Sequence, residues 1–183
     1  MPRNFLTPVA LLVPVLALLC GLVSEARAEP LPAPDVAGAW SKREPLTVEV
    51  ANPHVVAGAV GPRERFRGFP AAELLDAVVG PGWRGAGRGV EFRAADGYVS
   101  RVPSDHLQRY SAWLVFERAD SAPFVTDNIY LGQRDVPLGP WYLVWDNIGH
   151  PELIPLGDHY WPYQVVEMAV AESVVENAAQ LHD

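Results

Sequence analysis

Short strand-like runs separated by glycine and proline turns most strongly limit what this chain can fold into. The clearest run covers residues 46–50 (LTVEV), where Leu46, Val48 and Val50 alternate with polar residues, as expected for a strand with one buried face. Similar apolar runs follow at 112–117 (AWLVFE), 141–145 (WYLVW) and 163–170 (YQVVEMAV). Because regular crossover helices do not separate these runs, the pattern predicts an α+β domain with a mostly antiparallel or mixed β-sheet and a few short helices.

One helix and one hairpin stand out from the strand pattern. Residues 69–82 (FPAAELLDAVVGPG) combine an apolar stripe with a proline at the first helical position. Residues 89–103 (GVEFRAADGYVSRVP) form two strand-like halves around Asp96-Gly97, a dipeptide that tolerates the positive φ angles of a tight hairpin turn. Ser104 then offers an N-cap for a short helix before the next strand.

The first 28 residues have the pattern of a secretory signal peptide. Arg3 precedes an apolar run over residues 5–23, and a small-x-small cleavage pattern follows at residues 26–28. Pro8 and Pro14 interrupt the apolar run, which argues against a retained membrane span. We therefore expect a periplasmic or secreted protein with no membrane anchor after cleavage.

The remainder of the chain is acidic. Residues 29–35 (EPLPAPD) are predicted to be an extended, solvated lead-in, and residues 36–183 have the length of a single domain. Loss of Arg3, Arg27 and Glu25 with the leader reduces 14 basic and 22 acidic residues to 12 and 21, a formal charge of −9. Such a protein repels phosphate backbones and anionic lipids, so we expect no nucleic acid partner and favour a basic protein partner.

Cysteine chemistry is absent from the predicted mature chain, because the single cysteine, Cys20, lies in the leader. This excludes structural disulfides, zinc thiolate sites, iron–sulfur clusters, covalent haem attachment and cysteine nucleophiles. About 155 residues are left, which is enough to form a hydrophobic core without stabilisation by disulfides or metal sites.

Three segments carry a resemblance to a known family. They are FRGFPAAELLDAVVG (66–80), VEFRAADGYVSRVP (90–103) and GPWYLVW (139–145). In this order they resemble the oxidoreductase molybdopterin-binding domain, which typically shows a Gly-x-x-x-x-x-Leu-Leu helix, an Asp-Gly-Tyr hairpin and a late Gly-Pro strand. The resemblance covers residues 66–170 and implies a sulfite-oxidase-type fold in a redox setting.

The chain departs from this family at the cofactor. In the family a cysteine thiolate ahead of the helix ligates molybdenum, whereas this sequence has no cysteine there, and much of the family's amino-terminal half is missing. We therefore expect no cofactor and carry over none of the family's cofactor residues. The alternative is a molybdopterin-dependent oxidoreductase that holds its pterin without thiolate ligation.

Residues 147–160 contain several side chains that can bind a divalent ion. A metal hypothesis assigns the ligands to His150, Asp158 and His159, which can meet if the segment folds back on itself, and haem binding through the two histidines is a variant of it. The spacing matches no ligand motif of known meaning, and ordinary turns have the same composition. An ordinary connecting loop is therefore favoured over a metal site.

The predicted partner or ligand surface consists of Trp145, Asp146, Asn147, Trp161 and Tyr163. Tryptophan and tyrosine dominate binding hot spots, and a polar pair directly after a strand can hold a polar ligand at the end of a sheet. Core packing of the aromatic residues and ordinary turn chemistry for the polar pair are the alternatives.

These features predict an exported, non-catalytic binding or accessory subunit with a molybdopterin-oxidoreductase-like fold. Its expected partner is a basic redox protein such as a c-type cytochrome, because an acidic surface complements a basic docking face. The oxidoreductase and the metal- or haem-binding protein are the alternatives to this function.

Overall fold

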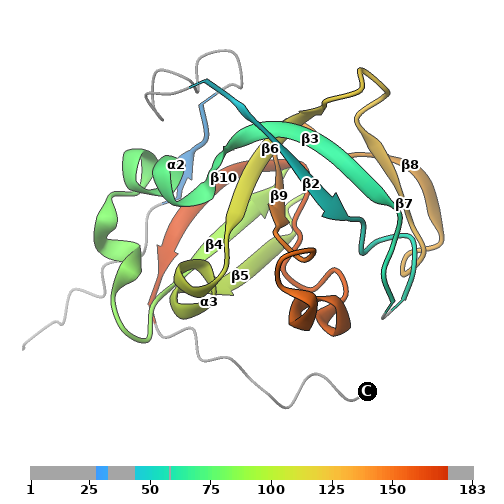
Figure 1. Ribbon diagram of the computed structural model, residues 1–183. Coiled ribbons are helices and arrows are strands. Elements are labelled where there is room, and N and C mark those ends of the chain that lie inside the picture. The colour runs from blue at the N-terminus through green and yellow to red at the C-terminus, as the bar shows by residue number, and fades with distance from the viewer. Residues whose placement is uncertain (1–27, 33–43, 58, 173–183) are drawn as a thin grey trace, which may run out of the picture.

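The computed structural model describes residues 28–32, 44–57 and 59–172, and antiparallel strands dominate them (Figure 1). One four-stranded sheet has the order β1 (Glu29–Pro30), β10 (Val165–Ala171), β4 (Gly89–Ala94) and β5 (Val99–Pro103). The other has the order β2 (Leu46–Ala51), β3 (Arg63–Pro70), β6 (Ala112–Arg118) and β9 (Tyr142–Trp145), and a separate hairpin pairs β7 (Val125–Asn128) with β8 (Gln133–Pro137). Each of these pairs is antiparallel, which confirms the predicted α+β class with a mostly antiparallel sheet.

The helices are short and connect strands. Helix α2 (Ala71–Val78) follows β3, and α3 (Ser104–Arg109) follows β5; each begins directly after a proline. Two 3-10 helices, η1 (Pro81–Arg84) and η2 (Pro151–Leu156), lie in the connections that follow α2 and β9. Within the described residues, none of these helices has the length and the apolar character needed to cross a bilayer.

Both sheets contribute to one hydrophobic core. Phe92 and Val102 of the first sheet belong to the same buried cluster as Phe66 and Leu114 of the second. Trp141, just before β9, joins the sheets directly through an isolated bridge to Val165, and its side chain is 1% exposed. The two sheets therefore pack as one unit, and the connections at their edges are fixed relative to one another.

Several predicted elements are found where the sequence placed them. The strand predicted at 46–50 is β2, and the predicted hairpin is β4–β5, in which Gly97 adopts a φ of 90°. The predicted helix within 69–82 is α2, which begins one residue after Pro70 because that proline still ends β3.

Apart from the strand in the lead-in, three strands of the structure were not predicted. These are β3 and the two strands of the β7–β8 hairpin. The predicted lead-in also begins as a strand, because Glu29–Pro30 pairs with Glu167 and Met168 of β10. Residues 33–35 of the lead-in, the predicted leader through residue 27 and the carboxy-terminal residues 173–183 lie outside the described residues.

Candidate functional site

A pocket of about 320 Å³ opens where four connections meet. They are the loop after β2, the β4–β5 turn, the β7–β8 hairpin and the segment that leads from η2 into β10. A volume of this size lies at the lower end of the range found for small-molecule sites, so the pocket suits a small ligand.

His54 is the most informative residue of the pocket wall. Its side chain is 1% exposed, and its Nδ1 lies 3.3 Å from Oδ2 of Asp158. The ring packs against Tyr142 and Tyr163, with ring centroids 5.7 Å and 5.5 Å away. Nε2 is fully buried and has no hydrogen-bond partner among the described residues. A buried polar atom without a hydrogen-bond partner destabilises the fold unless a ligand or a water molecule supplies the hydrogen bond.

The chemistry of His54 follows from its contact with Asp158. An ionised carboxylate only accepts hydrogen bonds, so in the neutral ring the proton is on Nδ1 and Nε2 is left as an acceptor. At the pocket wall such a nitrogen can accept a hydrogen bond from a ligand N–H or O–H group.

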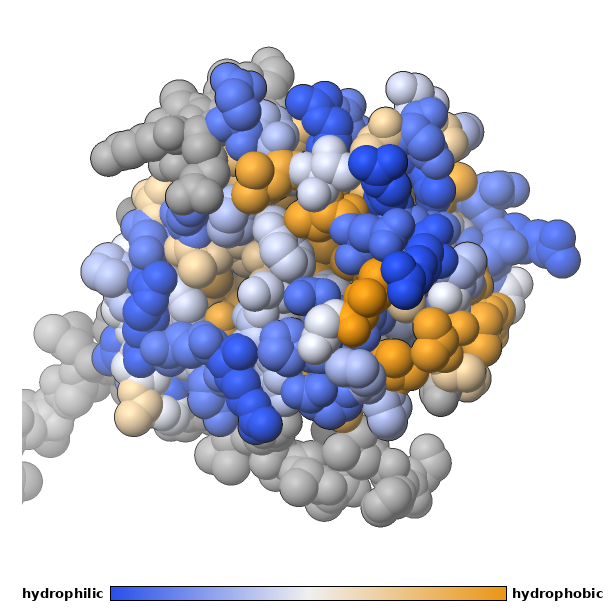
Figure 2. Space-filling model, viewed as in Figure 1, coloured by the Kyte–Doolittle hydropathy of each residue, from blue (hydrophilic) through white to orange (hydrophobic). Residues whose placement is uncertain are grey.

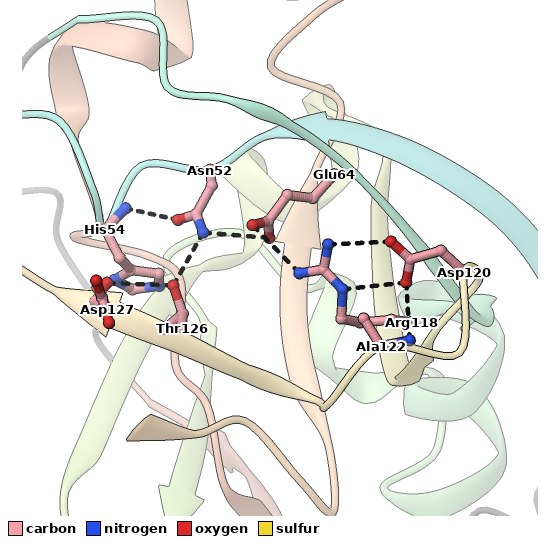
Figure 3. Close-up of polar contacts among 8 residues, drawn as sticks. All are labelled: Asn52, His54, Glu64, Arg118, Asp120, Ala122, Thr126 and Asp127. Atoms are coloured by element: carbon pink, nitrogen blue, oxygen red, sulfur yellow. Dashed lines mark hydrogen bonds and ion pairs between the residues drawn. The ribbon is translucent and has the colours of Figure 1, made fainter. Parts of the chain in front are cut away.

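A buried polar network holds the backbone of His54 in place (Figure 3). Its N–H donates to Oδ1 of Asn52 at 2.9 Å, and its carbonyl accepts from the N–H of Ile129 at 2.9 Å. The amide of Asn52 donates to Oγ1 of Thr126 at 2.9 Å and to Oε2 of Glu64 at 3.2 Å. The loop after β2 is thus tied to both β3 and β7.

The network ends in an ion pair at low exposure. Arg118 lies 3.2 Å from Glu64, and both side chains are 15% exposed. Arg118 also reaches Asp120 with two nitrogen atoms, and Asp120 in turn accepts from the N–H of Ala122 (Figure 3). The carboxylate next to Asn52 is therefore neutralised by an arginine from β6.

Aromatic side chains and carboxylates surround the mouth of the pocket. Tyr98, Trp161 and Tyr163 supply aromatic surface, and Asp96 and Asp158 supply negative charge. Burial raises the pKa of Tyr98, and the nearby Asp158, Tyr163 and Asp96 raise it further. Of the described residues that line the pocket, none is a lysine or an arginine, so its electrostatic character is negative.

Exposed apolar side chains adjoin the pocket. At the turn of the β7–β8 hairpin, Ile129, Tyr130 and Leu131 are 46%, 45% and 61% exposed, and the last two line the pocket. In Figure 2, apolar residues gather on the right-hand side, where Figure 1 shows the loop after β2 and this hairpin. The pocket thus has a partly apolar entrance.

A second buried histidine lies in an aromatic cage. The ring of His106 is in contact with Tyr110, Trp145 and Tyr160, with centroid distances of 4.7 to 4.8 Å. Burial lowers the pKa of His106 to about 4; Arg109 and His159 also lower it, while Asp105 opposes the shift. His106 is therefore neutral at pH 7 and belongs to the core.

The residues of the metal hypothesis have different neighbours in the structure. His150 pairs with Glu152 at 3.4 Å and packs on Tyr110. Asp158 contacts His54, whereas His159 stacks on Tyr160 with ring centroids 4.3 Å apart. Among residues 28–32, 44–57 and 59–172, no three histidine, cysteine or carboxylate side chains are grouped so as to hold a metal ion.

The residues of the predicted partner surface separate into two groups. Trp145 is 1% exposed and donates from Nε1 to the carbonyl of Tyr160, and Asn147 is 3% exposed. Asp146 accepts from the N–H of Gly149 in a turn. Trp145 belongs to the core because β9 is buried on both faces, whereas Asp146 and Asn147 belong to the connection that follows this strand.

Trp161 and Tyr163 are the members of that surface that line the pocket. Trp161 is 4% exposed, and the hydroxyl of Tyr163 accepts from Nδ2 of Asn128 at 3.3 Å. Asp158 and His159 from the metal hypothesis line the pocket beside these two residues.

His54, Asp96 and Tyr98 are not among the site residues that the sequence predicts. The sequence does predict Asp96 and Tyr98 to be parts of a hairpin, which they are, since the N–H of Tyr98 donates to Oδ1 of Asp96. The only local signal for His54 is a polar side chain after a strand, in the sequence Asn52-Pro53-His54. Its partner Asp158 is 104 positions away along the chain.

Comparison with known proteins does not assign the chain to a family. No protein-family model matches it, and no curated protein shows a significant match.

Proposed function

We propose that this chain is an exported, non-catalytic binding protein and that the pocket beside His54 is its ligand site. The observation that carries the proposal is that His54 lines a pocket of about 320 Å³ and has a buried Nε2 atom with no partner in the described structure. Burial of a polar atom without a hydrogen-bond partner costs free energy. A ligand that binds in the pocket and supplies the missing hydrogen bond would recover this free energy.

The binding role is tested by a fragment screen followed with amide NMR spectra of the isotope-labelled protein. We expect shifts concentrated on His54, Tyr98 and Trp161, and we expect them to decrease in a His54→Ala variant that keeps the native spectrum elsewhere. Fragments that bind only at other surfaces, or that bind the variant equally well, would contradict the proposed site.

A sulfite-oxidase-type fold without its molybdenum is part of this proposal. The order of α2, the Asp96-Gly97 hairpin and β9 supports it, because the resembling segments fall on these elements. Without the cysteine thiolate, we expect far less than one molybdenum per chain in protein isolated from its native host. About one molybdenum per chain, or a bound pterin, would instead favour the molybdopterin-dependent oxidoreductase.

The proposed setting is a redox system with a basic partner such as a c-type cytochrome. The formal charge of −8 for the full sequence supports it, because opposite net charges accelerate and orient association. Titration with a basic c-type cytochrome should show binding that weakens as salt is raised through the physiological range. Affinity that does not depend on salt, or no binding at low salt, would contradict this partner class.

Export is tested by the mass of the protein recovered from its native host. Cleavage after Ala28 predicts a mature chain that begins at Glu29. A form that keeps the leader would contradict the exported state.

A further inference from the structure

The hydrogen-bond acceptors of the pocket favour a ligand that donates hydrogen bonds. Nε2 of His54 is an acceptor when Nδ1 donates to Asp158. The carboxylates of Asp96 and Asp158, which also line the pocket, accept as well. The side chains with fixed charge in the described lining are therefore acceptors, and they carry negative charge.

The aromatic side chains of the pocket favour a positively charged ligand. Tyr98, Trp161 and Tyr163 line the pocket, and the faces of aromatic rings attract cations. Tyr98 stands at the β4–β5 turn and is 59% exposed, whereas Trp161 is 4% exposed. A cation would thus meet one ring at the entrance and a second, buried ring inside.

A metal ion satisfies these groups less well than an organic cation. In the part of the chain that the structure describes, no trio of histidine, cysteine or carboxylate ligands comes together. The pocket volume of about 320 Å³ and its apolar residues, such as Leu131 and Pro162, leave room for carbon atoms beside the charge. A molecule with a charged end and a hydrocarbon body matches both properties.

We propose that the pocket binds an alkylammonium group, with its N–H bonds directed at His54 and Asp158, its charge near the rings of Tyr98 and Trp161, and its hydrocarbon part against Leu131 and Pro162. This inference rests on the proposed binding function and names the chemical class of the ligand. A free primary amine and the side chain of a lysine on another protein both carry such a group, and the experiment separates these two sources.

The first arm of the experiment uses three probes of similar shape and different charge. They are phenethylamine, which is a cation at pH 7 because amines of this kind titrate near the lysine range, neutral 2-phenylethanol and anionic phenylacetate. Binding is followed by tryptophan fluorescence and calorimetry on the full mature protein. We expect phenethylammonium to bind at least about ten-fold more tightly than either of the other two probes.

The second arm compares two lysine mimics, Nα-acetyllysine amide and the same molecule acetylated on its ε-nitrogen. Binding of the charged mimic more tightly than phenethylammonium assigns the pocket to a lysine side chain of another protein. The reverse order assigns it to a free amine. Both results support the alkylammonium chemistry, whereas equal binding of the two lysine mimics contradicts it for the lysine source.

Two pocket variants and a matched control locate the effect. Asp96→Asn keeps an oxygen that can accept from the N–H of Tyr98 while it removes one charge, so it should fold normally and weaken the cation by about three- to ten-fold. His54→Gln removes the Nε2 acceptor. Glu117→Gln removes one charge from β6, outside the pocket lining, and should change affinity by less than about two-fold.

The outcomes separate the two proposals. Cation preference that is reduced by Asp96→Asn supports the inference. If the neutral or anionic probe binds equally well or better, and His54→Gln weakens that binding, the alkylammonium inference is wrong and the binding function stands. If no probe of any charge binds at millimolar concentration, both proposals are contradicted.

Discussion

The side chain of Asn147 forms hydrogen bonds with both backbone groups of Ala51, which lies 96 residues earlier in the chain. The N–H of Ala51 donates to Oδ1 of Asn147 at 2.9 Å, and Nδ2 of Asn147 donates back to the carbonyl of Ala51 at 2.7 Å. Ala51 is the last residue of β2, and Asn52 and His54 follow it directly. One side chain after β9 therefore fixes the end of the edge strand from which the pocket histidine is presented.

Replacement of Asn147 by alanine should destabilise the protein by about 2–4 kcal/mol. The reason is that the variant leaves a buried N–H and a buried carbonyl of Ala51 without partners, each at a cost of about 1–3 kcal/mol. Chemical denaturation measures the change. The exposed Gln133→Ala on β8 is the control and should stay within about 0.5 kcal/mol of the wild type; equal effects of the two substitutions would contradict the role of Asn147.

Two arginines allow a matched test of ion pairs at different exposure. Arg118 and its partner Glu64 are both 15% exposed, whereas Arg63 and Glu49 are 63% and 44% exposed. Arg118→Met should lower the free energy of unfolding by about 2–4 kcal/mol, because it leaves the Glu64 carboxylate partly buried and without its cation.

The exposed pair is the control for that test. Arg63→Met should cost less than about 1 kcal/mol, since exposed ion pairs contribute little. Thermal and urea denaturation of both variants measure the difference. A loss at Arg63 as large as the loss at Arg118 would show that burial does not set the contribution of these pairs.

His106 should make stability depend on pH between about 4 and 6.5. Burial lowers its pKa to about 4 in the folded protein, while the unfolded chain titrates near 6.5. The unfolded state therefore binds more protons in this window. The contribution of His106 is complete above about pH 6.5 and is lost as the pH falls to 4, by up to about 3 kcal/mol.

The variant His106→Phe isolates this contribution. It keeps an aromatic ring against Tyr110, Trp145 and Tyr160 and cannot be protonated. Unfolding free energies of both proteins, measured from pH 4 to pH 8, should diverge only below about pH 6.5, with the variant less sensitive to acid. Parallel curves across the whole range would place the acid sensitivity in other groups.

Calorimetric titration with copper, zinc and nickel should give flat curves for the wild type and for the double variant His150→Ala, His159→Ala. The two histidines contact different partners, Glu152 and Tyr160, so a shared ion would require both to turn away. Micromolar binding that is lost in the double variant and weakens as pH falls through the histidine range would make the metal hypothesis the better one.

The sequence predicted those elements whose pattern is local. Strand β2 alternates apolar and polar residues, and the β4–β5 turn has its Asp-Gly pair, so each could be identified from a few neighbouring residues. Strand β3 was missed because its sequence, RERFRGFP, has charged side chains at most of its early positions. The β7–β8 hairpin was missed because β8, QRDVP, has a single buried apolar residue.

Less of the site than of the fold could be predicted from the sequence. Trp161 and Tyr163 could be proposed as ligand residues because aromatic side chains are frequent in binding sites. His54 could not, since its significance depends on Asp158 and on its burial, and both result from tertiary packing. Asn147 has a local signal, a polar residue after a strand, but only the fold shows that its partner is the backbone of β2.

The position of β10 has a consequence for the order in which the structure forms. It is the last strand described, yet it lies between β1 and β4 in its sheet. During synthesis from the amino terminus, β1 and β4 leave the ribosome well before the strand that joins them. The first sheet therefore closes only after residues 165–171 have emerged, and Trp161 and Tyr163 reach the pocket at the same late stage. Contacts of this long range slow folding, so we expect the first sheet and the pocket to be completed at a late step of folding.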